Sequence, residues 1–93
     1  QVKQKGGKGM PEVEVGTVSD FFAHPVVAGI DLSDNLQQGN KIHIKGNTTD
    51  FELTVDSIQI NNAPVTEAKA GDAIGIKVSE RVRRGDTVYK VID

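Results

Sequence analysis

Apolar and polar residues alternate with a period of two along most of this 93-residue chain, which is typical of half-buried β-strands. Helical spacing is nowhere sustained over the roughly 10–12 residues that a helix needs. The sequence therefore predicts an all-β protein. The segments that alternate most clearly, each bounded by turn residues, are 13–22, 26–32, 41–45, 51–60, 65–68, 74–78 and 87–92.

The alternation changes phase at two places. Val15 and Val18 have opposite parity, with Gly16 between them, and the longest predicted strand, residues 51–60, changes phase near Asp56. A phase change inside a strand is what a β-bulge produces, and bulges let a sheet curl. With turn signals about every ten residues, the pattern predicts a six- or seven-stranded closed antiparallel β-barrel rather than a sandwich.

Length and composition indicate one small domain. The chain has 37% hydrophobic residues and no cysteine, which excludes a disulfide scaffold, a thiol nucleophile and a Cys-ligated metal. Residues 1–11 are rich in Gly, Lys and Gln, so we expect a disordered basic lead-in before a single domain over residues 12–93. Because the chain opens on Gln1 rather than Met, we expect this lead-in to be trimmed or not native.

Charge is distributed unevenly along the chain. Three lysines and no acidic residue precede Glu12, whereas residues 12–93 hold eight Lys and Arg against 13 Asp and Glu, a formal charge of −5. Strong sequence-independent affinity for nucleic acid needs a cationic surface, so any contact with RNA must be local. No apolar run approaches 18 residues and no leader precedes the domain, so we expect a cytoplasmic protein without a membrane partner.

Four stretches carry a resemblance to a known family: residues 36–44, 55–58, 65–77 and 84–88. The third reads Val-Thr-Glu-Ala-Lys-Ala-Gly-Asp-Ala-Ile-Gly-Ile-Lys and the fourth Arg-Gly-Asp-Thr-Val. In order and spacing they resemble the second domain of translational GTPases, most of all the small stand-alone elongation-factor-like proteins of archaea and bacteria. A similar barrel also ends some collagenase-like peptidases. The resemblance implies a prokaryotic translation-factor barrel that contacts RNA or the translation machinery.

The same stretches make physical sense as barrel corners. Gly71-Asp72 and Gly85-Asp86 each precede an alternating run. Glycine accepts the positive φ of a tight turn, and aspartate caps such a turn with its own carboxylate. The phosphate-binding sequence Gly-x-x-x-x-Gly-Lys-Ser/Thr is absent, so we expect no bound nucleotide and no GTPase activity.

Catalytic chemistry finds little support. His24 and His43 alone would fill half of a tetrahedral metal site. A general acid or base needs a further partner residue within reach, and the sequence pattern does not indicate one. The serines lie in ordinary strand or turn contexts. We therefore expect no enzyme activity, no metal and no cofactor.

Two clusters are candidates for contact with a partner. Lys77, Arg81, Arg83 and Arg84 could grip phosphate oxygens, or form a solvated loop balanced by neighbouring acidic residues. Phe21 and Phe22 have opposite parity, so one ring faces the core. The other ring either covers an end of the barrel or docks a partner together with the neighbouring His24.

The sequence thus predicts a non-catalytic, elongation-factor-like binding module that contacts RNA or the translation machinery. The alternative is a protein-interaction domain that works with a separate peptidase-like or RNA-modifying enzyme and makes no contact with RNA.

Overall fold

The computed structural model describes residues 11–23 and 26–92, which form ten β-strands. These residues contain no helix, and hence none that is long and apolar enough to cross a membrane. The strands are β1 (Glu12–Ala23), β2 (Val26–Leu32), β3 (Leu36–Gln37), β4 (Lys41–Lys45), β5 (Asp50–Thr54), β6 (Ile58–Ile60), β7 (Ala63–Val65), β8 (Glu67–Ala68), β9 (Ala73–Lys77) and β10 (Thr87–Val91).

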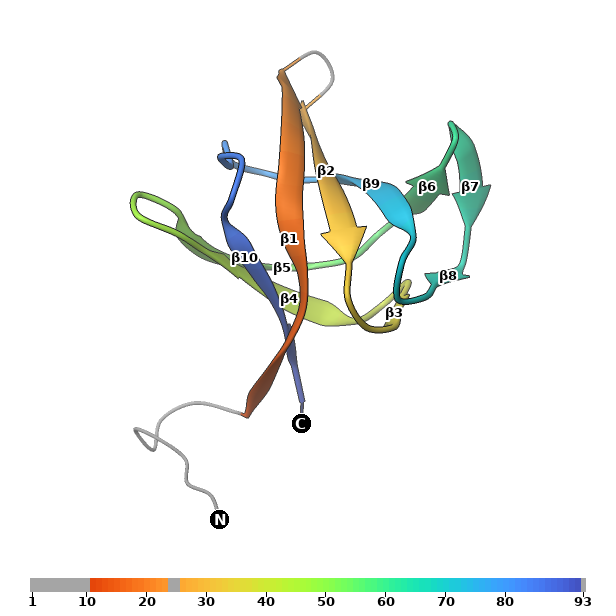
Figure 1. Ribbon diagram of the computed structural model, residues 1–93, viewed down its shortest axis with the longest axis horizontal. Coiled ribbons are helices and arrows are strands. Elements are labelled where there is room, and N and C mark those ends of the chain that lie inside the picture. The colour runs from red at the N-terminus through yellow and green to blue at the C-terminus, as the bar shows by residue number, and fades with distance from the viewer. Residues whose placement is uncertain (1–10, 24–25, 93) are drawn as a thin grey trace.

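Eight strands form one curled antiparallel sheet in the order β5-β4-β10-β1-β2-β9-β6-β7, and β3 pairs with β8 in a second, two-stranded sheet (Figure 1). The all-β, antiparallel prediction is confirmed. The closed barrel is not, because the edge strands β5 and β7 do not pair with each other in the described part of the chain. The prediction of six or seven strands was also too low, since it did not foresee that short segments pair as separate strands.

The predicted single strand over residues 51–60 is wrong. The chain leaves β5 at one edge of the sheet and, after residues 55–57, enters β6, which lies next to the opposite edge. Val55, the first residue of this crossing, and Ile58, the first residue of β6, are both buried. A break between two strands changes the parity of inward-facing residues just as a bulge does, and the sequence pattern alone does not separate the two.

The predicted bulge at Gly16 is confirmed. The pairing of β1 with β10 shifts register between Glu14 and Gly16, so that the fully buried Val15 is the extra residue. Glycine is needed here because a Cβ would lie 2.7 Å from the carbonyl oxygen of Asp31. A second register shift, between Val18 and Asp20 in the pairing of β1 with β2, was not predicted.

The core lies between the curled sheet and the β3–β8 pair. Its buried hydrophobic residues come from most of the strands and from three loop positions, so the fold has one continuous core. They are Val15, Val18, Ala28, Ile30, Leu32, Leu36, Ile42, Ile44, Val55, Ile58, Ala68, Ile74, Ile76, Val78, Val82 and Val88.

Three four-residue corners share one geometry: residues 37–40, 69–72 and 83–86. The third residue of each is a glycine with φ between 94° and 96°. The fourth is Asn or Asp, and its side-chain oxygen accepts a 2.8 Å hydrogen bond from the backbone N–H of the first. The two corners predicted from the sequence therefore have the predicted structure, and the corner at residues 37–40 is a third that the sequence analysis did not identify.

Each corner also clamps one buried residue by its backbone. The glycine N–H donates to the carbonyl of that residue at 2.8 Å, and the residue's own N–H donates to the carbonyl of the fourth corner residue at 2.8–2.9 Å. The clamped residues are Val55, Leu32 and Val18. The corners thus satisfy backbone groups of the core where the sheet ladders end.

Candidate functional site

The β1–β2 hairpin extends beyond the body of the sheet (Figure 1). Phe21 pairs with the buried Ala28 and packs against the core, while the next residue, Phe22, is 52% exposed. The expectation that only one of the two rings faces inward is confirmed. Val26, at the other side of the hairpin tip, is 38% exposed. The hairpin end therefore offers apolar surface to solvent.

The outward-facing residues of the hairpin continue onto β9. Directly opposed residues of antiparallel strands point to the same face, and Phe22 pairs with Val27, which pairs with Lys77. The next row on this face comprises Asp20, Gly29 and Gly75. We call these six residues the outer patch.

The two glycines make the middle of the outer patch flat. Gly29 and Gly75 are paired directly across β2 and β9. The neighbouring strand residues on this face all carry side chains. A Cβ added at Gly75 would make an ordinary contact at 3.4 Å with Val27, so the fold does not itself require glycine there. Bare backbone in the middle of strands marks a place where another molecule can approach closely.

The cationic loop between β9 and β10 is anchored to the core rather than free. Val78 and Val82 are buried, and the buried carboxylate of Asp86 accepts a hydrogen bond from the backbone N–H of Arg83. Gly46 presses on this carboxylate so closely that no Cβ would fit there. The burial of Val82 is not predictable from the sequence, since a single apolar residue among charged ones has no periodicity.

The arginines of this loop point in different directions. The guanidinium of Arg81 lies over the Phe21 ring, 5.6 Å from its centroid. Arg83 donates from Nε to the Thr48 hydroxyl at 2.9 Å. Arg84 is 77% exposed and lies 3.8 Å from Asp20, at the border of the outer patch.

A shallow pocket of about 260 Å³ opens between β1 and the cationic loop. It is lined by Asp20, Phe21, Arg81, Val82, Arg83 and Arg84. A larger groove of about 450 Å³ lies at the β3–β8 pair and is lined mainly by polar residues, with the carboxylates of Asp56 and Glu67 among them. The two hollows therefore differ in charge, and only the smaller one is cationic.

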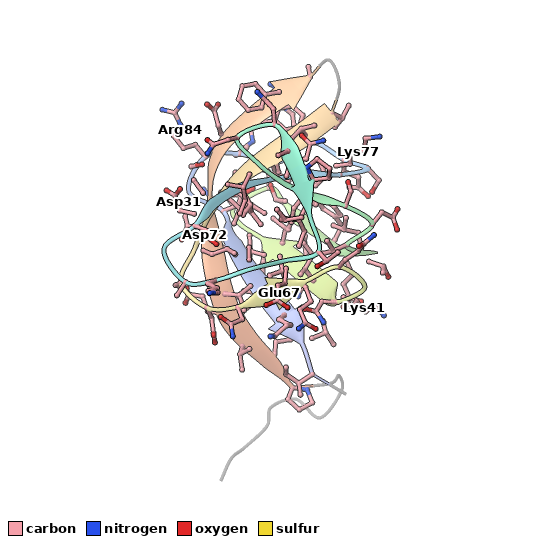
Figure 2. All side chains as sticks on the ribbon, turned by 90° about the vertical axis from the view of Figure 1, so that its right-hand side faces the viewer. Asp31, Lys41, Glu67, Asp72, Lys77 and Arg84 are labelled. Atoms are coloured by element: carbon pink, nitrogen blue, oxygen red, sulfur yellow. The ribbon has the colours of Figure 1, made fainter. Side chains whose placement is uncertain are left out.

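The structure brings three of the seven predicted contact residues together at the outer patch or its border. Figure 2 shows Arg84 and Lys77 on either side of the upper half of the molecule, while Glu67 and Lys41 lie lower. Phe22 and Lys77 share the outer patch, and Arg84 borders it. The remaining predicted residues fall elsewhere: Phe21 and Arg81 at the end of the core, Arg83 against Thr48, and His24 outside the described residues.

His43 forms a second cluster, which the sequence analysis did not foresee. From β4 it contacts Glu12 on β1 at 2.8 Å through Nδ1 and Asp50 on β5 at 2.5 Å through Nε2. Both ring nitrogens can donate only when the ring is protonated. Burial acts to lower the pKa of His43, but the hydrogen bonds and charges of Asp50 and Glu12 outweigh it and raise the pKa above 6.5.

A metal ion is a second interpretation of this cluster, because Glu12, His43 and Glu52 bring ligand atoms within 4.8 Å of one another. A metal ligand must be an unprotonated ring nitrogen. The raised pKa of His43 favours the imidazolium, and Glu52 already pairs with Lys41 at 3.4 Å. The cluster therefore has the character of an ion-pair network.

Comparison with known proteins identifies a relative described as a protease, whereas the sequence motifs suggested translational GTPases. The chain is 42% identical over 79 residues to the uncharacterized protease MJ0090 of Methanocaldococcus jannaschii. The match covers 84% of this chain but spans only about a fifth, 19%, of the relative. No family model matches the chain.

Solved structures agree on the fold. Two crystal structures of the C-terminal domain of a Geobacillus thermoleovorans protein, described as a U32 peptidase, superpose with TM-scores of 0.78 and 0.77 at 13% sequence identity. They cover 81% and 95% of this chain, and 95% and 98% of the domain.

The resemblance to the second domain of translational GTPases is therefore wrong, and the description as an elongation-factor-like protein falls with it. The misleading residues were the Gly-Asp pairs at the corners. The structure shows that each pair serves a local turn that occurs three times in this chain, so the pairs report corner geometry and not a family. In fold and in sequence, this chain is similar to parts of proteins described as peptidases.

Proposed function

We propose that this chain is a non-catalytic accessory domain that works with a peptidase-like enzyme through protein–protein contact. The observation that carries the proposal is the extent of the match to the M. jannaschii protease. The match takes in most of this chain and only 19% of the relative, so most of the relative lies outside the shared domain. The fold also stands as the C-terminal domain of a protein described as a U32 peptidase.

The chemistry of the described residues supports a non-catalytic role. Both ring nitrogens of His43 are held by carboxylates, and no serine or threonine hydroxyl hydrogen-bonds to this ring in residues 11–23 and 26–92. A nucleophile activated by a histidine needs such a contact.

A protein partner is favoured over RNA by charge. Residues 12–93 carry a formal charge of −5. Arg81, Arg83 and Arg84 line one shallow pocket, but their guanidinium groups contact three different partners: Phe21, Thr48 and Asp20. Backbone-directed RNA binding depends on several cations that act together on phosphates. An accessory role through protein contact does not need such a group of cations.

The proposal can be tested with the M. jannaschii relative. We would prepare the 93-residue chain and the relative without its matching 79-residue segment, then measure their binding by isothermal titration calorimetry. We would also follow hydrolysis of labelled casein and gelatin by each alone and by both together. We expect the chain to bind the truncated relative and to hydrolyse neither substrate by itself. Hydrolysis by the isolated chain, or no binding to the truncated relative, would contradict the proposal.

A further inference from the structure

We propose that the outer patch, with Arg84 at its border, is the surface by which this domain docks onto the peptidase-like enzyme. The inference rests on the proposed function and adds the surface and the chemistry of its partner. The occupant is a protein surface that presents a large apolar side chain flanked by carboxylates. Three independent features of the patch lead to this occupant.

The first feature is unpartnered apolar surface. Phe22 is 52% exposed and stands beside Val27 on the same face. An exposed aromatic ring next to aliphatic side chains is the composition of the centre of a protein interface. The core has no need of Phe22, because Phe21 fills the inward position.

The second feature is the flat floor of Gly29 and Gly75. Adjacent glycines destabilise strands, because they have no side chains to pack and lose more backbone entropy on folding than other residues do. No Cβ clash within the fold requires glycine at Gly75. A flat ring or a long aliphatic side chain of a partner can lie directly on this backbone. The apolar centre of the occupant follows from this floor together with Phe22 and Val27.

The third feature is the charge at the two sides. Lys77 ends the row that begins with Phe22, and Arg84 lies on the opposite side, next to Asp20. The Arg84–Asp20 contact is 3.8 Å long and both side chains are half or more exposed, so the guanidinium can still take up a second carboxylate. Two exposed cations on an otherwise acidic domain favour an acidic partner surface.

Single substitutions separate the patch from the rest of the domain. With the truncated relative as the probe, we expect Phe22→Ser and Arg84→Glu each to weaken binding tenfold or more, which is the size of effect expected at an interface hot spot. The matched controls are Val13→Ser, which changes an apolar residue 41% exposed near the other end of β1, and Lys69→Glu, which changes an exposed lysine in a different corner. Both controls should bind as the wild type does.

Gly75→Thr gives a test that a purely structural role cannot imitate. Threonine favours strands and its Cβ makes only an ordinary contact with Val27, so the melting temperature should stay the same or rise. The added side chain occupies the floor of the patch, so binding should fall tenfold or more. A stable Gly75→Thr variant that still binds with wild-type affinity overturns the docking surface.

The outcomes distinguish failure of the proposed function from failure of the proposed docking surface. If the wild-type chain does not bind the truncated relative, the proposed function fails. If the wild type binds and the patch variants bind equally well, the accessory role stands and the assignment of the surface is wrong. A 20-nucleotide single-stranded RNA is the third probe: if the chain binds it at low salt and Arg84→Glu abolishes that binding, the patch is an RNA site and the proposed protein occupant is overturned.

Discussion

The outer patch and the His43 cluster lie on the outward face of the same sheet, but they differ in whether their charged side chains are paired within the fold. In the His43 cluster each ring nitrogen has a carboxylate partner within 2.8 Å, and the partners come from strands on both sides of β4 and β10. In the outer patch, Lys77 is exposed beside the exposed Phe22, and Arg84 is exposed at the border of the patch. The first arrangement ties strands together, whereas the second leaves its groups available to another molecule.

The difference shows why a cluster of charged residues has to be judged by its partners. The arginine-rich loop stands out in the sequence by its density of cations, yet two of its three arginines are engaged within the fold. The sequence suggests His43 only together with His24, as half of a metal site, because its contacts with residues 31 and 7 positions away are set by strand pairing. The proposed docking surface is therefore chosen by which side chains remain available at the hairpin end, and not by the number of cations.

The largest effect should come from the anchor beneath the cationic loop. Asp86→Ala removes the buried carboxylate that accepts the hydrogen bond of the Arg83 N–H, leaving that group without its partner. We expect the free energy of unfolding in urea to fall by about 1–3 kcal/mol. Because Arg84 belongs to the same corner, binding to the truncated relative should weaken as well.

Asp72→Ala is the matched control for that prediction. Asp72 makes the same hydrogen bond, to the Lys69 N–H, but its side chain is only half-buried. Water can therefore replace the lost acceptor, and the loss of stability should be clearly smaller. Equal losses for the two variants would mean that burial does not set the strength of the corners.

The His43 cluster should make stability depend on pH. The raised pKa of His43 gives stabilisation that is complete below pH 6.5 and is lost as the pH rises through the folded-state value. The hydrogen bond from His43 lowers the pKa of Asp50, which gives stabilisation above pH 3.8 that is lost as the pH falls through its folded-state value. The cluster should therefore contribute most between pH 3.8 and 6.5.

The variant His43→Gln tests this dependence. We expect the difference in melting temperature between the wild type and His43→Gln to be largest near pH 5 and to shrink toward pH 8. The decisive measurement is the pH profile of that difference by differential scanning calorimetry. A flat profile would show that the two ring contacts do not involve the charged ring. Binding through the outer patch should not change, since His43 lies on β4 and the patch on β1, β2 and β9.

The smallest effect should come from the cation over the Phe21 ring. Arg81→Ala removes an exposed cation–π contact, and we expect a loss of about 0.5 kcal/mol in the free energy of unfolding. Lys69→Ala, which removes an exposed cation without an aromatic neighbour in the described residues, serves as the control and should change stability less. A loss at Arg81 of several times this size would show that the residue holds the loop in place. The hairpin end would then, like the His43 cluster, contain a charged contact that stabilises the fold.

Local features were predictable where one residue type suffices to cause them. Residues 26–32 and 41–45 alternate cleanly, and the strands β2 and β4 have those bounds. The bulge at Gly16 and the corners at Gly71 and Gly85 also follow from single glycines. The break in residues 51–60 was not predictable, because its parity pattern equals that of a bulge. The same local logic misled the family assignment, since the Gly-Asp pairs recur wherever such a corner is built.

The sequence by itself determined the β class, the facing of most strand residues and the chemistry of two corners, because each depends on neighbours along the chain. Tertiary structure alone decided that Phe22, Val27 and Lys77 form one row, that Gly29 faces Gly75, and that His43 reaches carboxylates 31 and 7 residues away. These arrangements depend on the order of strands in the sheet and on their register. Alternation excludes a one-residue slip of register, because such a slip would turn the apolar side chains away from the core, but it does not encode which strands become neighbours or a shift of two residues.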